Sequence, residues 1–467
     1  MTKTVRDLVV IGGGPGGYGG AIRAAQLGMD VVLVEKDDRL GGTCLLRGCI
    51  PTKALLHSAG LFRQMQGAAD HGIKAAEVEV DYPGVLTHKD RVVEASVAGL
   101  RYLMDKNEIE VRNGTGRIVA ADEVEVTADD GPVSRVACRN ILVATGSSPC
   151  QLDGVEIDGV RVVTSDELLG MRQIPESLIV LGGGSVGVEF ASVFAQFGSR
   201  VSIIELLPRL LPNEDEEISD QLGAAFRRRG IACLTDARVD EVVTTGDGVE
   251  CTAIDHRSER TSLSASVLLV AVGRTPFVKG LGLDDVAVRR EQGFVSVDKY
   301  MQTSVSGVYA VGDVLQTPQL AHVAAAEARV AAEHMAGVPT RPIDYLTTPS
   351  CTYSDPEVAS VGLTEKAARE AGYDVAVGRF PFTASGKARI LDQVDGLVKV
   401  VADREYDEVL GVHIIGASAT ELIAEAGMMR QAEVTTEDVV RLMHPHPTLS
   451  EAIQEAMHDV HGTPVHF

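Results

Sequence analysis

Two stretches of the sequence decide the fold: Leu8-Val-Val-Ile-Gly-Gly-Gly-Pro-Gly-Gly17 and Leu178-Ile-Val-Leu-Gly-Gly-Gly-Ser-Val-Gly187. Each is typical of an apolar strand that runs into a glycine turn, and the second repeats the first. A helical segment, a second apolar strand and an acid follow in both copies. These are residues 18–27, residues 31–34 and Glu35 in the first copy, and residues 188–197, residues 201–204 and Glu205 in the second. The repeat predicts two dinucleotide-binding folds in series.

The glycines of these turns have separate tasks. The first allows a tight turn, the second lets the backbone approach a pyrophosphate, and the third lets the helix pack closely on the strand. These positions are Gly12, Gly14 and Gly17 in the first copy, and Gly182, Gly184 and Gly187 in the second. The helix N-terminus offers amides and a favourable dipole to the phosphates.

The two acids indicate what the sites bind. Glu35 and Glu205 stand where a carboxylate accepts a ribose hydroxyl. At Glu205 such an acid repels a 2′-phosphate and favours NAD over NADP, with Arg209 expected to be a solvated loop residue. Two sites indicate two dinucleotides, most simply a tightly held flavin and a diffusible nicotinamide. The order along the chain does not say which is which.

Composition limits the class of protein. At ~150 residues per domain, 467 residues indicate about three domains. The 45% hydrophobic and 23% charged residues exclude a disordered chain. A net charge of −23 repels phosphate backbones and anionic lipids, so nucleic acid and membrane are poor partners. Seven cysteines are too few for a disulfide scaffold. The 48 glycines suggest many tight turns or close approaches to ligands.

The predicted location is the cytoplasm. The apolar strand from Asp7 to Ile11 begins too early to leave room for a targeting peptide of roughly 15–30 residues. No stretch approaches the ~18 uninterrupted apolar residues of a membrane span.

A pair of cysteines lies between the repeats, in Gly41-Gly-Thr-Cys-Leu-Leu-Arg-Gly-Cys-Ile-Pro-Thr-Lys53. In a regular helix Cys44 and Cys49 would be ~8.6 Å apart between Cα atoms, whereas a disulfide needs less than ~7 Å. A bridge therefore requires a distorted turn, which Gly48 and Pro51 favour. Two unpaired buried cysteines are the alternative. Zinc spacing is missing, so no metal is expected, and beside a dinucleotide fold a catalytic dithiol is the favoured hypothesis. The other five cysteines are expected to be packing residues.

The C-terminal part has a different character. Predicted strands over 396–401 and 409–415, with helices over 419–432 and 436–442, indicate an α+β domain. It ends in His444-Pro-His-Pro-Thr-Leu-Ser-Glu451. Dithiol chemistry moves protons near neutral pH, where histidine titrates, and Glu451 is placed to orient the ring of His446. A structural loop is the alternative.

The dithiol segment resembles the redox-active signature of the pyridine nucleotide-disulfide oxidoreductases, and the resemblance continues along essentially the whole chain. The matching stretches are Gly114-Thr-Gly116, Ala144-Thr-Gly-Ser-Ser-Pro149, Ala271-Val-Gly-Arg-Thr-Pro276 and Val308-Tyr-Ala-Val-Gly-Asp313. The resemblance implies FAD in the first fold and NAD in the second. It also implies an α/β architecture of two Rossmann-like domains with a C-terminal α+β interface domain. The expected boundaries are 1–148 for the FAD domain, 149–275 for the NAD domain, 276–344 for a return segment and 345–467 for the interface domain.

The resemblance assigns the sites residue by residue. Residues expected to bind FAD are Gly12, Gly14, Gly17, Glu35, Gly42, Thr43, Lys53, Gly116, Thr145, Gly146, Ser147 and Asp313. Those expected to bind NAD are Gly182, Gly184, Gly187, Glu189, Glu205 and Gly273.

The resemblance also implies a catalytic relay. Cys44 exchanges with the thiol substrate and Cys49 lies nearer the flavin, while Lys53 pairs with an acid near the flavin ring, here Glu189. His446 and Glu451 correspond to a catalytic dyad that reaches the thiols of the other subunit. The implication is an obligate homodimer with two composite sites.

Within the family, three features favour the dihydrolipoamide dehydrogenase group. They are the NAD-type acid Glu205, the ending His-Pro-Thr-Leu-Ser-Glu-Ala452, and the lack of a cysteine beyond Cys351. The implied activity is oxidation of protein-bound dihydrolipoyl groups by NAD+. The implied partner is a lipoyl-bearing carrier or acyltransferase subunit of a 2-oxoacid dehydrogenase or glycine cleavage complex. A flavin reductase for another low-molecular-weight thiol is the alternative, and a docking subunit without turnover is a remote one.

The chain departs from the family's usual pattern at four positions. Leu46 and Arg47 replace Asn and a small apolar residue, Phe277 replaces a common Asn, and Ala328 stands where Gly is common. Arg47 places a cation between the thiols, where it either lowers a thiol pKa or is simply solvated.

Overall fold

A computed structural model describes residues 5–75, 77–128, 131 and 133–467. The chain forms two compact units. The first contains the residues up to Ala54, Pro83–Cys150 and Gly273–Ile343, and the second contains Leu55–Tyr82, Gln151–Val272 and Asp344–Phe467. Each unit is therefore assembled from segments distant in the sequence, and the predicted domain boundaries stay a prediction.

The first unit is built on a sheet in the order β3-β2-β1-β6-β5-β4, with β19 beside β6. Its strands are β1 (Arg6–Ile11), β2 (Val31–Glu35), β3 (Glu110–Asn113), β4 (Thr115–Ala120), β5 (Glu123–Thr127), β6 (Val133–Val143) and β19 (Val308–Ala310). Smaller strands are β7 (Ser147–Pro149), β16 (Arg274–Pro276), β17 (Arg290–Glu291) and β18 (Phe294–Val295). The strands β1, β2, β3, β6 and β19 pair in parallel. Their carboxyl ends therefore meet at one edge, where ligands bind in such sheets.

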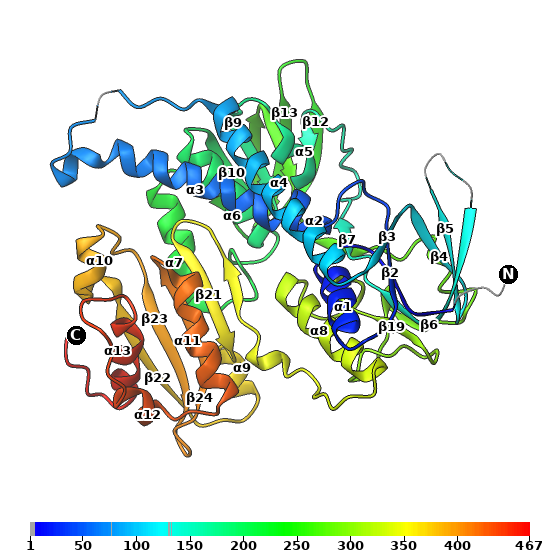
Figure 1. Ribbon diagram of the computed structural model, residues 1–467. Helices are drawn as coiled ribbons and strands as arrows, with labels where there is room; N and C mark the ends of the chain where they lie inside the picture. The colour runs from blue at the N-terminus through cyan, green and yellow to red at the C-terminus, as the bar shows by residue number, and fades with distance from the viewer. Residues whose placement is uncertain (1–4, 76, 129–130, 132) are drawn as a thin grey trace. The chain divides into compact units, whose positions relative to one another are not determined.

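Helices complete the first unit. They are α1 (Pro15–Gln26), α2 (Gly42–Arg47), the beginning of α3 (Cys49–Gln66), most of α4 (Tyr82–Lys106) and α8 (Ala321–Met335). Figure 1 shows α1 and α8 side by side, and small residues line their contact. A Cβ atom on Gly20 would lie 3.4 Å from that of Ala328. Alanine at 328 is therefore accommodated because its neighbour on α1 is a glycine.

The second unit carries a second parallel sheet in the order β11-β10-β9-β15-β8. Its strands are β8 (Val162–Val163), β9 (Ser177–Leu181), β10 (Arg200–Ile204), β11 (Ala232–Leu234) and β15 (Val267–Val270). An antiparallel sheet beside it contains β12 (Ala237–Thr244), β13 (Val249–Asp255) and β14 (Arg260–Ala265). Its helices are α5 (Ser165–Gly170), α6 (Ser185–Gln196) and α7 (Glu216–Arg228). Phe190 and Phe194 on α6 are almost fully buried, so this helix anchors the sheet.

The C-terminal part of this unit is an antiparallel sheet in the order β20-β21-β24-β23-β22. Its strands are β20 (Ser350–Thr352), β21 (Glu357–Gly362), β22 (Val375–Pro381), β23 (Leu397–Asp403) and β24 (Val409–Gly416). Its helices are α9 (Glu365–Glu370), α10 (Gly386–Ile390), α11 (Ala419–Gln431), α12 (Thr436–Val440) and α13 (Glu451–Val460), with α11 and α13 packed on the sheet (Figure 1). The predicted strands and helices of this α+β region are confirmed. Among the described residues, no helix is long and apolar enough to cross a membrane.

Candidate active site

The two glycine turns have the same geometry. Gly12 and Gly182 have φ angles of +105° and +104°, which side chains rarely adopt. A Cβ atom on Gly17 would lie 1.7 Å from the carbonyl oxygen of Gly12, and one on Gly187 would lie 1.9 Å from that of Gly182. The first and third glycines are therefore required by the chain itself, as the repeat predicts.

The two acids hold these turns through backbone hydrogen bonds. Glu35 accepts from the N–H of Gly13 at 2.5 Å and from the N–H of Asp37 at 2.9 Å. In the second copy, Glu205 accepts from the N–H of Gly183 at 2.5 Å and from the N–H of Leu207 at 2.8 Å. Both side chains are buried. A carboxylate oxygen can accept more than one hydrogen bond, so each acid fixes its turn and keeps capacity for a ribose hydroxyl.

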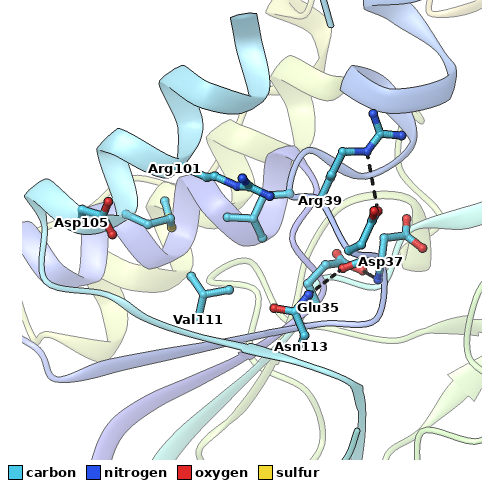
Figure 2. Close-up of a pocket in the computed structure, with 10 residues that line it drawn as sticks. Glu35, Asp37, Arg39, Arg101, Asp105, Val111 and Asn113 are labelled. Carbon is cyan, nitrogen blue, oxygen red and sulfur yellow. Dashed lines mark hydrogen bonds and ion pairs between the residues drawn. The ribbon is translucent and has the colours of Figure 1, made fainter. Parts of the chain in front are cut away.

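A cavity of about 310 Å³ opens beside Glu35 at the carboxyl edge of the first sheet. Figure 2 shows Arg101 and Asp105 on α4 and Asn113 at the end of β3 lining it. Asp37, which follows β2, contributes to the same wall. The volume lies in the range of ligand pockets, and the position suits the adenosine end of a dinucleotide. The residues present therefore fit FAD.

The dithiol segment passes directly over the first glycine turn. A Cβ atom on Gly42 would lie 2.6 Å from the Cα of Gly14. The close approach expected at Gly14 is thus made in part by the chain's own backbone. It brings the residues after Gly42 to the same edge of the sheet as the cofactor turn.

The helix is broken between the two cysteines, which is the distorted turn that their spacing requires. Cys44 lies in α2, Gly48 ends that helix, and Cys49 begins α3. A Cβ atom on Gly48 would lie 2.9 Å from the carbonyl oxygen of Thr43, so the backbone folds back on itself. The thiols of Cys44 and Cys49 consequently share a hydrogen bond. Both cysteines are half-buried.

The surroundings of the thiols set their acidity. The hydrogen bond to Cys49 raises the pKa of Cys44 well above its usual value, and burial raises it further. The charge of Lys53 lowers this pKa, whereas that of Asp313 raises it. Tyr18 on α1 lies in the same neighbourhood, because burial and then the charges of both thiols raise its pKa. No motif in the sequence points to Tyr18.

Arg47 has an acidic partner close to the dithiol segment. Its guanidinium pairs with the carboxylate of Asp37 at the wall of the cavity. The cation that acts on Cys44 is Lys53. The carboxylate of Asp37 opposes the charge of Arg47. That Arg47 lowers a thiol pKa stays a prediction.

Asp313 and Ser147, both predicted to bind FAD, lie in contact. The hydroxyl of Ser147 donates to Asp313 at 2.5 Å. Arg274 donates to the hydroxyl and the carbonyl oxygen of Ser147 at 2.7 and 2.8 Å. Arg274 was missed in the prediction of the site, although it lies in a quoted motif. Together these residues form a polar patch at the carboxyl edge of β6 and β19.

The other residues predicted for FAD lie along the same unit. The hydroxyl of Thr145 donates to the carbonyl oxygen of Phe277 at 2.7 Å, and the carbonyl oxygen of Gly146 accepts from Phe277 N–H at 2.8 Å. Gly116 lies on β4 against β1 and β2. Gly273, predicted for NAD, belongs to the first unit, where its carbonyl oxygen accepts from Cys150 N–H at 2.9 Å.

The second glycine turn leaves its middle position open. A Cβ atom on Gly184 would meet nothing within 4 Å, unlike those of Gly182 and Gly187. Arg209 is held by acids of the following helix, with Nε 3.0 Å from Asp220 and NH2 3.4 Å from Glu216. Arg209 therefore has two acidic partners on α7.

Glu189 lies buried on α6 in the second unit. Its carboxylate accepts from the N–H of Tyr353 at 2.9 Å. Lys53 belongs to the first unit. The pairing of Lys53 with Glu189 stays a prediction.

The C-terminal dyad is formed within one chain. Nδ1 of His446 lies 2.8 Å from Oε1 of Glu451, and Oε2 of Glu451 accepts from the N–H of Thr448 at 2.8 Å. Burial raises the pKa of Glu451, but these two hydrogen bonds outweigh it and lower the pKa overall. The His446 side chain is 80% exposed. The ring is therefore oriented on one side and open on the other.

Burial makes three of the other five cysteines weakly acidic. Burial raises the pKa of Cys138 to about 12 and the pKa values of Cys233 and Cys251 to about 11. Such thiols are poor nucleophiles at neutral pH. Among the described residues, no group of three or more His, Cys, Asp or Glu side chains is arranged to hold a metal ion.

Comparison with known proteins decides the family. The model of "Pyridine nucleotide-disulphide oxidoreductase" matches residues 6–328, and that of its dimerisation domain matches residues 348–457. The chain belongs to this family. The predicted fold class, oxidoreductase activity and cofactors FAD and NAD are thereby confirmed. The dimerisation domain supports the predicted homodimer.

Individual relatives are similar over nearly the full length. A dihydrolipoyl dehydrogenase of Bacillus subtilis is 43% identical, covering 99% of this chain and 100% of the relative. One from Chlorobaculum tepidum is 44% identical, covering 97% and 96%. The crystal structure of LpdA from Mycobacterium tuberculosis superposes with a TM-score of 0.90 at 28% identity, covering 97% of this chain and 99% of that one.

Proposed function

We propose that the protein oxidises protein-bound dihydrolipoyl groups to the lipoyl disulfide and reduces NAD+ to NADH, the reaction of a dihydrolipoyl dehydrogenase. The observation that carries this proposal is the hydrogen-bonded pair Cys44–Cys49 at the carboxyl edge of the first dinucleotide fold. The names of the full-length relatives support the same substrate. The proposal includes the predicted domain ranges: 1–148 for FAD, 149–275 for NAD, 276–344 for the return segment and 345–467 for the interface.

The cysteines carry out the thiol exchange. A thiolate of the substrate attacks Sγ of Cys44 in the oxidised pair, and Cys49 leaves as a thiolate. The second substrate thiol then displaces Cys44, which releases the lipoyl disulfide and leaves both cysteines reduced. Two electrons and two protons have then passed from substrate to protein. Bound FAD supplies the path by which the electron pair reaches NAD+.

The local charges assist this exchange. Lys53 favours the thiolate of Cys44 against burial and against the second thiol. Without that cation the pair would hold its protons more tightly, because an apolar site disfavours the charged form.

The dyad takes and returns the protons. His446 accepts a proton from the substrate thiol, and Glu451 holds the ring and stabilises its charged form. An imidazole that is 80% exposed cannot be shielded by its own chain during catalysis. This exposure supports the composite site, in which the dyad of one subunit serves the thiols of the other.

The second fold accommodates NAD. The carboxylate of Glu205 at the turn and the engagement of Arg209 by Asp220 both disfavour a 2′-phosphate. A lipoyl-bearing carrier or acyltransferase subunit of a 2-oxoacid dehydrogenase or glycine cleavage complex is the partner that this activity requires.

Steady-state turnover tests the proposal. Purified FAD-loaded protein is supplied with dihydrolipoamide, reduced glutathione or another dithiol, each with NAD+ or NADP+. The expected result is rapid reduction of NAD+ by dihydrolipoamide alone. Turnover of a different thiol with no activity on dihydrolipoamide would instead favour a reductase for another low-molecular-weight thiol.

A further inference from the structure

The segment that follows β2 makes two side-chain contacts with residues distant in the sequence. Nζ of Lys36 lies 4.2 Å from the ring centroid of Phe277. Asp37 pairs with the guanidinium of Arg47.

The contact between Lys36 and Phe277 crosses the glycine turn. In the first sheet β1 lies between β2 and β6, and all three are parallel. Lys36 comes directly after β2. Phe277 is fixed to the segment after β6 by its hydrogen bonds with Thr145 and Gly146. A link between these two ends must span the carboxyl end of β1, where the turn of Gly12 lies.

We propose that Lys36 and Phe277 form a strap across the glycine turn of the FAD site and slow the release of FAD. The proposal rests on FAD occupying this first fold. A pyrophosphate at the turn is anionic, so the ammonium group of Lys36 attracts it, and the ring of Phe277 holds that ammonium through its negative face.

A second contact steadies the strap from the other side. Asp37 also donates its N–H to Glu35, the acid that fixes the glycine turn. With its carboxylate bound to Arg47 at the end of α2, the segment is tied to the dithiol helix. These bonds hold the backbone from which the Lys36 side chain extends, so the segment cannot move away from the turn unless they break.

The rate of FAD release from the holoenzyme tests the strap, independently of turnover. Release is followed by the fluorescence of free flavin at a fixed bromide concentration. Lys36→Met and Phe277→Asn are each expected to accelerate release about two- to fivefold, from the strength of an exposed cation–π contact. The double variant should release FAD no faster than the faster single variant. Lys36→Arg and Phe277→Tyr should keep the wild-type rate.

A matched control is available in the same unit. Nζ of Lys299 lies 5.2 Å from the ring centroid of Tyr300, away from the glycine turn, so Lys299→Met should leave release unchanged. The strap would be overturned if Lys36→Met released FAD at the wild-type rate, or if Lys299→Met accelerated release as much as Lys36→Met does. It would also be overturned if the accelerations of the two single variants multiplied in the double variant. Lys36 is exposed, so its variant decides the question even if Phe277→Asn fails to fold. Wild-type protein that takes up no FAD contradicts the proposed function as well, whereas loaded protein with unaltered release contradicts the strap alone.

Discussion

Nδ1 of His446 lies 2.8 Å from Oε1 of Glu451, and the rest of the imidazole is open to solvent. The hydrogen bond fixes which nitrogen faces the carboxylate, so the other nitrogen is the one presented to a substrate thiol. The two residues come from opposite sides of a turn that leads into α13. This arrangement makes the dyad testable apart from the dithiol.

Replacement of Glu451 by Gln should slow the thiol half-reaction far more than electron transfer from NADH. Loss of the carboxylate removes the group that stabilises a charged imidazole, and such acid–base assistance contributes roughly 10²–10⁴-fold. Rapid-mixing absorbance measurements of the two half-reactions check this. Glu425→Gln is the matched control, because Glu425 pairs with the buried His444 of the same histidine cluster at 2.9 Å. Equal losses in both half-reactions would refute the role of the dyad.

The middle and last glycines of the second turn should respond differently to alanine. Gly184→Ala meets no atom within 4 Å, so the fold and bound FAD should survive while the dissociation constant for NADH rises. Gly187→Ala would place a Cβ 1.9 Å from a backbone oxygen and should lower the melting temperature or prevent folding. NADH titration and thermal unfolding measure the two effects. Unchanged NADH binding in Gly184→Ala would argue against a pyrophosphate at this position.

Lys399 should be essential to the stability of the second unit. Its buried ammonium lies 2.8 Å from Asp215 and 2.9 Å from Glu365. Lys399→Met leaves the buried carboxylate of Asp215 without the cation that pairs with it, whereas Glu365 keeps its pair with Arg369. Breaking a buried pair costs about 3–5 kcal/mol of unfolding free energy. The exposed pair of Arg441 and Glu437 is the control, with an expected loss of less than ~1 kcal/mol for Arg441→Met. Denaturant unfolding that gives equal losses would contradict the buried network.

This network also predicts a pH dependence. Burial raises the pKa of Asp215, but the hydrogen bond from Lys399 and neighbouring charges lower it overall. A depressed carboxyl pKa contributes stability above the usual value of about 3.9, and this stability is lost as pH falls through the folded value. Acid unfolding of Asp215→Asn should therefore show a weaker dependence on pH below about 4 than the wild type. Parallel curves would contradict this assignment.

The contact of Val465 and His466 with Glu455 on α13 should be most stable at mildly acidic pH. Glu455 accepts from the N–H groups of Val465 and His466 and lies 2.7 Å from Nδ1 of His466. The bond to Glu455 raises the pKa of His466, so this contribution is complete below about 6.5 and is lost as pH rises through the folded value. The pKa of Glu455 is lowered despite burial, so its contribution is lost as pH falls below the usual value of about 4.3. Hydrogen-exchange protection of the amides of residues 465 and 466, corrected for intrinsic rates, should be highest between these two pH values. In His466→Gln this protection should depend less on pH.

Local sequence patterns predicted the parts whose geometry depends on few residues. The turns at Gly12 and Gly182 follow from spacing alone, because only glycine fits where a Cβ would strike a backbone oxygen. The broken helix between Cys44 and Cys49 follows from the reach of a disulfide. The pairing of His446 with Glu451 required the resemblance to a family as well.

Contacts between distant segments were not predictable in the same way. The partner of Arg47 is Asp37, and nothing in their spacing indicates that the two side chains meet. Tyr18 and Arg274 were missed because each is brought to the site by packing of α1 or by the short strand β16. Such neighbours depend on how helices and strands are stacked, which periodicity does not specify.

Anaerobic titration with dihydrolipoamide, followed by absorbance, shows whether Cys44 and Cys49 exchange electrons with the substrate and the flavin. FAD-loaded wild-type protein should develop a long-wavelength band from the Cys49 thiolate beside the flavin. Cys49→Ser should never show the band, while Cys44→Ser should show it before any reductant is added and should not exchange with substrate. A band that persists in Cys49→Ser, or a wild-type protein that never develops one, would contradict the assigned relay.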